Sequence, residues 1–255
     1  MKLHTLLYDF SDIIGAVPEM DAIRLIPTSN AVQFFGISEA TTKNSKLVLE
    51  GQTVEPIEEI AKPFGIPSLQ HITKVFKAPK FNRLTASADL QEFTWESEFE
   101  HLALSNQDGA HYNISVYGEK LSRERIKVAK LKQNVNYQVS TTPTQDSVNL
   151  IKYWLKIARQ NGETNVELTP ITRDGKLLFK TKAGSIFDVE YVVDGNINGI
   201  LNKPCVYNGR TLFQLMSLAQ CAKQATLLFS DLGLCRIDID TSCAKYTFLI
   251  PAVAY

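Results

Sequence analysis

The chain has 255 residues, 44% of them hydrophobic, which is enough to bury one large core or two of ordinary size. Its 27 basic residues balance 27 acidic residues, which excludes binding of a polyanion through bulk positive charge. Any contact with a polyanion would have to use cations that are segregated locally. The sequence has no run of about 18 apolar residues, so it predicts no membrane-spanning helix.

The first half of the chain predicts a helix over residues 3–14, where the apolar residues follow helical spacing. A hairpin follows, with strands at 22–28 and 31–38 around a Ser29-Asn30 turn, and then a strand at 46–50. Residues 68–78 predict a second helix with Ser68 as its N-cap. Further strands are expected at 90–104, 111–117 and 125–132, with a turn at 107–109.

The second half repeats this order of elements. Residues 148–160 predict a helix, and residues 165–182 predict a hairpin that bends at Asp174-Gly175. A strand at 186–193 and a helix at 209–225 follow. The last strands are expected at 226–230, 234–240 and 245–250. The repeated order indicates two similar domains, 1–132 and 148–255, joined by a connector and edge strand at 133–147.

The helix at 148–160 carries Lys152, Lys156 and Arg159 on one stripe that no acidic residue interrupts. A solvated helix usually mixes charges of both signs, so a stripe of one sign indicates a polyanionic partner such as nucleic acid. The helix at 68–78 places Lys74 and Lys77 on its polar face, and the helix at 209–225 places Arg210 there. The alternative interpretation is a solvated surface, and the first helix has no such cations. A basic run from Lys120 to Lys132 is interpreted as the solvated face of an edge strand.

Three segments resemble a known family. RDGKLLFKTKAGS (173–185) resembles its Asp-Gly hairpin, KYTFLIPAV (245–253) its closing strand, and ISEATTKNSKLVLE (37–50) the loop and strand beside its partner pocket. With the repeated layout, they make the chain similar to the DNA sliding clamps, the family of proliferating-cell nuclear antigen and of phage or viral polymerase processivity factors. The resemblance implies an α+β, two-domain clamp fold in which helices line a hole and antiparallel sheets form the outer wall.

The resemblance also implies partners and sites. The partners are double-stranded DNA, a DNA polymerase, a clamp loader and two further copies of the chain in a homotrimer. DNA contact is expected from Lys74, Lys77, Lys152, Lys156, Arg159 and Arg210. A pocket for partner peptides is expected from Ile37, Leu47, Leu131, Val135, Leu234, Phe248, Pro251 and Val253. The subunits are expected to pair through strands near 111–117 and 179–187.

No catalytic, metal or cofactor motif is found. The four histidines are scattered, and the four cysteines lie outside zinc-binding spacings, so we interpret the cysteines as reduced thiols of a cytoplasmic protein. The cytoplasm would be that of a bacterial host for a phage protein. The N-terminal segment, with Asp9 and Asp12 in its apolar run, is not typical of a signal peptide. Two alternatives stay open: a monomeric processivity factor that binds DNA on an open basic face, and an unrelated α+β enzyme or structural virion protein.

Overall fold

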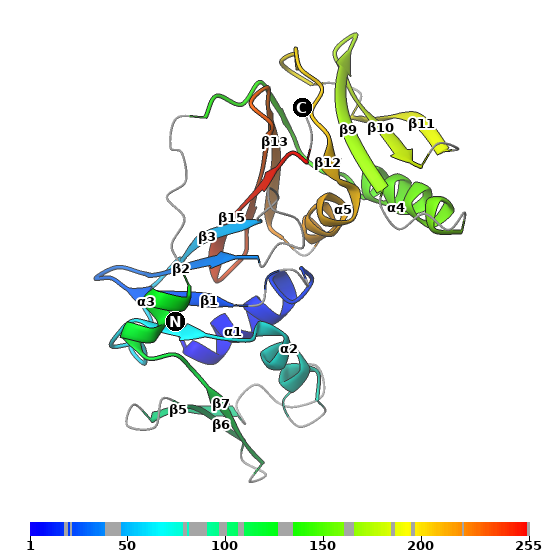
Figure 1. The fold of residues 1–255 in the computed structure, drawn as a ribbon. Helices are drawn as coiled ribbons and strands as arrows, with labels where there is room; N and C mark the ends of the chain where they lie inside the picture. Colours follow the sequence, from blue (N-terminus) through cyan, green and yellow to red (C-terminus); the bar gives the residue numbers. More distant parts are fainter. Residues whose placement is uncertain are drawn as a thin grey trace. The chain divides into compact units, whose positions relative to one another are not determined.

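The computed structural model describes residues 1–17, 20, 22–38, 47–78, 81, 91–96, 101–106, 110–126, 135–160, 166–184, 187–194, 197–220 and 222–253. The chain forms two compact units (Figure 1). Unit 1 comprises Met1–Glu39, Val48–Ala129 and Thr241–Tyr246. Unit 2 comprises Ala40–Leu47, Lys130–Asp240 and Thr247–Tyr255.

Unit 1 contains the helices α1 (Leu3–Ile13), α2 (Leu69–Lys77) and α3 (Glu119–Arg125). Its strands are β1 (Ile23–Pro27), β2 (Val32–Ile37), β3 (Val48–Thr53), β4 (Phe64–Ile66), β5 (Gln91–Glu96), β6 (His101–Asn106) and β7 (His111–Ser115). Antiparallel pairing joins them in the orders β4-β1-β2-β3 and β5-β6-β7. The predicted first helix and the hairpin after it are thereby confirmed.

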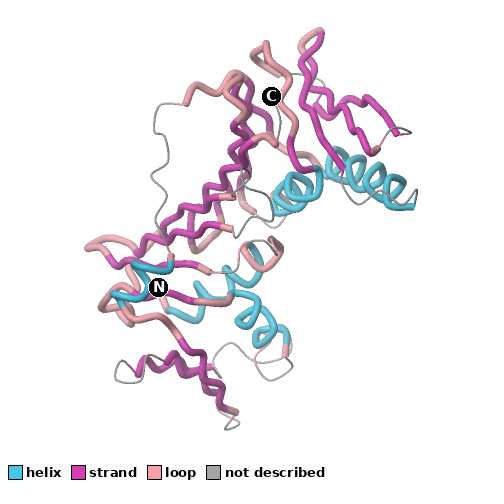
Figure 2. Tube along the Cα trace, in the orientation of Figure 1, coloured by secondary structure: helices cyan, strands magenta, loops and turns pink. Residues whose placement is uncertain are grey.

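The core of unit 1 forms because α1 has an apolar face at helical spacing. Leu3, Leu6, Leu7 and Phe10 are all buried. The ring of Phe10 meets that of Phe34 on β2 edge to face, with the ring centroids 5.0 Å apart. Helix α2 lies beside α1 (Figure 2).

Unit 2 contains the helices α4 (Gln145–Gln160) and α5 (Gly209–Leu218). Its strands are β8 (Val139–Thr141), β9 (Val166–Arg173), β10 (Lys176–Ala183), β11 (Phe187–Asp194), β12 (Tyr207–Asn208), β13 (Gln224–Ser230), β14 (Leu234–Asp240) and β15 (Ala244–Pro251), of which residues 244–246 count with unit 1. They follow the orders β11-β10-β9-β12 and β15-β14-β13-β8. The predicted hairpin is confirmed: Asp174 and Gly175 take φ values of 52° and 70°, as a tight two-residue turn requires.

The sheet β11-β10-β9-β12 has one apolar and one charged face. Pro170, Phe179 and Tyr191 lie side by side across it and are buried. The next row, Thr169, Lys180 and Glu190, points to the opposite face, because side chains alternate along a strand. Helix α4 lies beside β11, and α5 lies beside β9 and β12. The helices therefore cover the apolar face and leave the charged face to solvent.

The structure corrects several expected boundaries. Residues 119–125 form helix α3, so Arg125 ends a helix and does not begin a strand; residues 127–132 lie outside the described part of the chain, as does the predicted turn at 107–109. The strand expected at 90–104 is two antiparallel strands, β5 and β6. Helix α5 ends at Leu218, and Gln224 lies on β13 opposite Asp240. Helix α4 begins three residues earlier than predicted, at Gln145.

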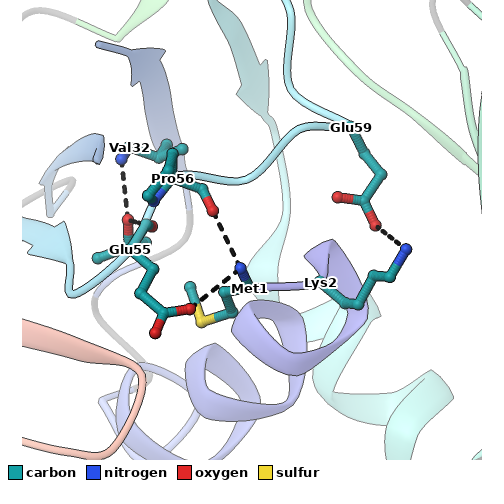
Figure 3. Close-up of polar contacts among 7 residues, drawn as sticks. Met1, Lys2, Val32, Glu55, Pro56 and Glu59 are labelled. Atoms are coloured by element: carbon teal, nitrogen blue, oxygen red, sulfur yellow. Dashed lines mark hydrogen bonds and ion pairs between the residues drawn. The ribbon is translucent and has the colours of Figure 1, made fainter. Parts of the chain in front are cut away.

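The segment 51–66 has a defined role in unit 1. Strand β3 continues through it to Thr53, and β4 begins at Phe64. Between the two strands, the segment contacts the first residues of the chain, as Figure 3 shows. The amino group of Met1 lies 3.3 Å from the Glu55 carboxylate and donates to the carbonyl of Pro56 at 3.1 Å. Lys2 lies 3.8 Å from Glu59. These contacts tie the segment to the start of α1.

Candidate nucleic-acid interface

Helix α4 is capped at its start and anchored along its inner face. Thr144 and Ser147 exchange backbone-to-hydroxyl hydrogen bonds of 2.9 and 3.2 Å, a reciprocal cap that satisfies two free N–H groups. Ile151 is fully buried, and Trp154 stacks on Tyr191 with the ring centroids 6.1 Å apart. Because this face is held against the sheet, the opposite face of the helix points to solvent.

That solvent-facing side carries the predicted cations of α4. Lys152, Lys156 and Arg159 are exposed, and within the described part of the chain none of them forms an ion pair. The three extra residues of the helix extend the polar stripe, since Gln145 donates to Asn149 at 2.9 Å. Asp146 also enters the helix, but it lies in the first turn, where a carboxylate favours the helix dipole, and about 120° around the axis from Lys152. The stripe therefore remains free of acidic residues.

Helix α2 presents a smaller basic face. Its buried residues Leu69, Ile72 and Phe76 fix the orientation, and Lys74 and Lys77 are exposed on the other side. The helix lies close to the end of α1: a side chain at Gly15 would come within 2.5 Å of the Thr73 hydroxyl. Both lysines lie in the last turn, where they also stabilise the helix dipole. Helix stability alone could account for their positions.

Helix α5 is different, because its cation lies at the unfavourable end. Asn208 caps the helix by accepting from the Thr211 N–H at 3.1 Å, and Arg210 follows, exposed, in the first turn. A positive charge beside a helix N-terminus is destabilising, so the helix gains no stability from Arg210. Gln214 is half-buried, and Gln224, expected on this helix, lies on β13. Arg210 is thus the cation on α5 that helix stability leaves unexplained.

Three cations on strands of unit 2 have carboxylate partners, which the six predicted helix cations lack. Arg173 lies 2.7 Å from Glu190, Lys180 lies 3.0 Å from Asp188, and Arg236 lies 2.8 Å from Asp238. On the described residues of α2, α4 and α5, the six predicted cations form no ion pair. Charge is therefore segregated locally, as the zero net charge requires of a polyanion-binding protein.

The residues predicted for a partner pocket fall into two groups by exposure. Phe248 and Leu47 are 0% and 3% exposed, so they support the core and cannot contact a peptide directly. Ile37, Val135, Leu234 and Pro251 are half-buried, and Val253 is 41% exposed. Leu131 lies outside the described residues.

Backbone hydrogen bonds within unit 2 bring part of this set together. Ala252 donates to the Gly233 carbonyl at 2.8 Å, and Val253 donates to Val206 at 2.7 Å, which fixes the tail beside the β13–β14 turn. That turn exposes 65% of Leu232, a residue that sequence reasoning missed. The sequence contained a signal for this exposure, because an apolar residue within an Asp-Leu-Gly turn lies at the surface and cannot be buried in the core. Leu232, Leu234, Pro251 and Val253 are hereafter called the tail surface.

The structural comparisons show what the fold is similar to. PCNA in the PCNA2–PCNA3 complex from Sulfolobus tokodaii is 14% identical, with 98% of this chain and 97% of that chain covered and a TM-score of 0.66. PCNA from Entamoeba histolytica is 11% identical, with coverages of 95% and 94% and a TM-score of 0.63. A. fulgidus PCNA, bound to the C-terminal region of FEN-1, is 12% identical, with coverages of 99% and 96% and a TM-score of 0.61.

At these identities, the likeness establishes the fold, and the chain has the sliding-clamp fold of PCNA. The predicted α+β clamp architecture is therefore confirmed. No family model and no curated protein matches the sequence. No described helix is both long and apolar enough to cross a membrane. The described residues also include no cluster of histidine, cysteine, aspartate or glutamate that could hold a metal ion.

Proposed function

We propose that this protein is a sliding clamp that encircles duplex DNA without sequence preference and tethers a DNA polymerase. The observation that carries the proposal is the contrast in charge pairing. Three strand cations, Arg173, Lys180 and Arg236, form ion pairs with carboxylates, whereas all six predicted cations of α2, α4 and α5 are exposed and form no ion pair among the described residues. The sliding-clamp fold supports the same function.

The chemistry fits such a role. Lysine and arginine side chains attract phosphates whatever the base sequence, and they release counterions as they do so. The proposed DNA contacts are Lys74, Lys77, Lys152, Lys156, Arg159 and Arg210. A clamp must move along the duplex, and non-specific attraction of this kind permits sliding. This role requires no catalytic residue.

We further propose that the ring is a homotrimer of two-domain chains, each with a connector near residues 133–147. Strands β7 and β11 are ends of their sheets in the described part of the chain, and they carry the exposed apolar residues Tyr112 and Val192. The expected edge at 179–187 is corrected here, because Phe179 lies on β10, which is paired on both sides. Pairing of β7 with β11 of the next subunit would cover both edges.

Solution mass tests the ring. Light scattering after gel filtration should give three times the mass of one chain, even in high salt. Val192→Asp should reduce this to the mass of one chain, because the aspartate would place a charge within the buried subunit contact. Val54→Asp is the control, since Val54 is also exposed but lies at the end of β3. The monomeric alternative predicts the mass of one chain for all three proteins.

Partner binding is proposed for the tail surface of unit 2 and, separately, for Ile37 on unit 1. A. fulgidus PCNA has a partner segment, the C-terminal region of FEN-1, bound to it. In this chain, Leu232 and Val253 are the most exposed apolar residues of the tail surface, and buried apolar anchors dominate small interfaces of this kind. We expect peptides of a polymerase and of a clamp loader to bind there.

A further inference from the structure

Arg24 is a buried cation that the proposed function does not use. It is the second residue of β1 and is only 7% exposed. Its Nε is buried and has no hydrogen-bond partner among the described residues. A buried N–H donor without a partner is costly, and such groups in native proteins are normally paired. Arg24 therefore calls for a physical explanation.

The neighbours of Arg24 place it on the face of unit 1 that α3 covers. Arg24 lies opposite Gly65 on β4 and opposite Phe35 on β2, so these three positions share one face of the sheet. Helix α3 packs closely over Gly65, since a side chain there would come within 2.9 Å of both Ser122 and Ile126. The absence of a side chain at Gly65 is thus what allows α3 to lie beside Arg24.

Positive charge is in excess at this place. Burial lowers the pKa of Arg24, the positive charge of Arg123 lowers it further, and Glu119 acts in the opposite direction. Glu119 is also shared, because its carboxylate lies 3.5 Å from the guanidinium of Arg123. Two guanidinium groups therefore share the Glu119 carboxylate, and the next described carboxylate on this face of the sheet, Glu50, lies two strands away from Arg24, opposite Phe35. Lys120 and Arg125 add further exposed positive charge on α3, against Glu124 alone.

The same face carries apolar groups. Alternation along β2 places Ile37 on the side of Phe35, and both are half-buried. Val48 on β3 lies opposite Ile37 and is also half-buried. Leu121 on α3 is 36% exposed. An apolar surface with excess cations at one end favours a ligand that combines apolar and acidic groups.

We propose that the exposed Arg123, reinforced by the positive charge of the buried Arg24, forms a carboxylate-binding site for an acidic residue that flanks the apolar anchor of a partner peptide. The proposal deepens the partner-binding part of the proposed function and rests on it, because Ile37 belongs to both. The incoming carboxylate supplies the second negative charge that the two guanidinium groups lack, and arginine is suited to paired hydrogen bonds with carboxylates. A polynucleotide is less suitable, since it would need a longer row of unpaired cations, as on α4.

The test uses two fluorescein-labelled synthetic peptides that share an apolar core and carry either glutamates or glutamines on both sides. In low salt, the wild-type protein should bind the glutamate peptide about tenfold more tightly. In Arg123→Gln, the advantage should fall to about twofold, while affinity for the glutamine peptide stays unchanged. Lys176→Gln removes an exposed cation of unit 2 and should keep the full advantage. Arg24→Met preserves the volume of the side chain and should also lose the preference for the glutamate peptide. Thermal unfolding of this variant shows whether its fold persists.

Equal affinity of the wild-type protein for both peptides would overturn the proposal, and so would an undiminished advantage in Arg123→Gln. A single-stranded oligonucleotide could also displace the glutamate peptide. If the binding of that oligonucleotide depends on Arg123, the ligand of the site is nucleic acid and not an acidic peptide. The result is separable from the clamp proposal. If the protein prefers the glutamate peptide but does not encircle DNA, the carboxylate site is supported and the clamp function is contradicted. If the protein encircles DNA but does not prefer the glutamate peptide, only the carboxylate site is contradicted.

Discussion

The hydroxyl of Tyr246, on β15, donates a hydrogen bond to the carboxylate of Asp9, on α1, across 2.5 Å. The same carboxylate oxygen accepts from the hydroxyl of Thr241 at 2.8 Å. Tyr246 is 1% exposed, and its ring packs against those of Phe10 and Phe34. Residues 237 positions apart in sequence are thus joined inside unit 1. The first helix therefore depends on the last strand for part of its packing.

Tyr246→Phe should lower the free energy of unfolding by about 1–2 kcal/mol, because the Asp9 carboxylate loses a buried donor. Urea denaturation measures the change. Tyr153→Phe is the control: Tyr153 is 55% exposed, so the loss of its hydroxyl should change stability by less than about 0.5 kcal/mol. Equal stability of wild type and Tyr246→Phe would show that the hydrogen bond contributes nothing.

Alkaline pH should destabilise the protein partly through Tyr191. Burial raises the pKa of Tyr191 to about 12, although its hydrogen bond with Thr181 acts in the opposite direction. In the unfolded chain this pKa is about 10. Between these values the unfolded chain has lost the proton and the folded chain still holds it. The contribution of Tyr191 to the free energy of unfolding is therefore complete below about pH 10. As the pH rises toward 12, this contribution falls by about 1.4 kcal/mol per pH unit.

Tyr191→Phe should remove that contribution, so its unfolding free energy should fall less steeply with pH than that of the wild type. Urea titrations at several pH values between about 9 and 12 measure both slopes. Other buried tyrosines, such as Tyr246, contribute equally to both proteins. Identical slopes would show that Tyr191 has the same pKa in the folded and unfolded chains.

Local signals in the sequence were sufficient for much of the fold. The Asp174-Gly175 hairpin was predicted because few other residue pairs adopt two successive positive φ values. Helix α1 was predicted from its apolar spacing alone. The cations of α4 were placed correctly on an exposed stripe for the same reason, since helical periodicity fixes which residues share a face.

Other features depend on tertiary contacts that a sequence pattern does not contain. The apolar residues after Leu218 continue a helical pattern, but the chain enters β13 because Gln224 and its neighbours pair with β14. Helix α3 is short, and its position depends on the space above Gly65. Phe248 was expected on the surface, but alternation along β15 turns it into the core.

Replacement of Lys152, Lys156 and Arg159 together by alanine should reduce the slope of log affinity against log salt by about 2–3 units for duplex DNA, equally for unrelated sequences. Each of these side chains is exposed and unpaired within the described residues, so each can release a counterion. The matched control replaces Arg173, Lys180 and Arg236, which are paired with carboxylates, and should leave the slope unchanged. An unchanged slope in the α4 variant would show that the stripe is only a solvated surface without DNA contact.

The tail surface should be tested by substitution, not by truncation. Removing the residues after Leu249 would delete Ile250, which is 3% exposed, and the hydrogen bonds of Ala252 and Val253. We therefore expect truncation to destabilise the protein, and its effect on partners would be ambiguous. Leu232→Ser with Val253→Ser changes two exposed side chains and preserves the backbone contacts.

This double variant should keep the oligomeric mass and the thermal stability of the wild type. It should bind an apolar polymerase peptide at least about 30-fold more weakly, because truncating one anchor of a small interface costs about 2 kcal/mol or more. Fluorescence anisotropy with a labelled peptide measures the affinity. Ile200→Ser, another exposed apolar residue of unit 2, is the control. Unchanged affinity in the double variant would place the peptide elsewhere.

The most direct test of a closed clamp is its retention on duplex DNA whose ends are blocked. The protein is first allowed to thread onto a linear duplex with biotinylated ends, and streptavidin is then added to half of the sample. After transfer to high salt, which screens phosphate attraction, a ring should remain on the capped duplex and leave the uncapped one. Equal dissociation from both duplexes would contradict encirclement and would favour an open protein that binds DNA only through its basic face.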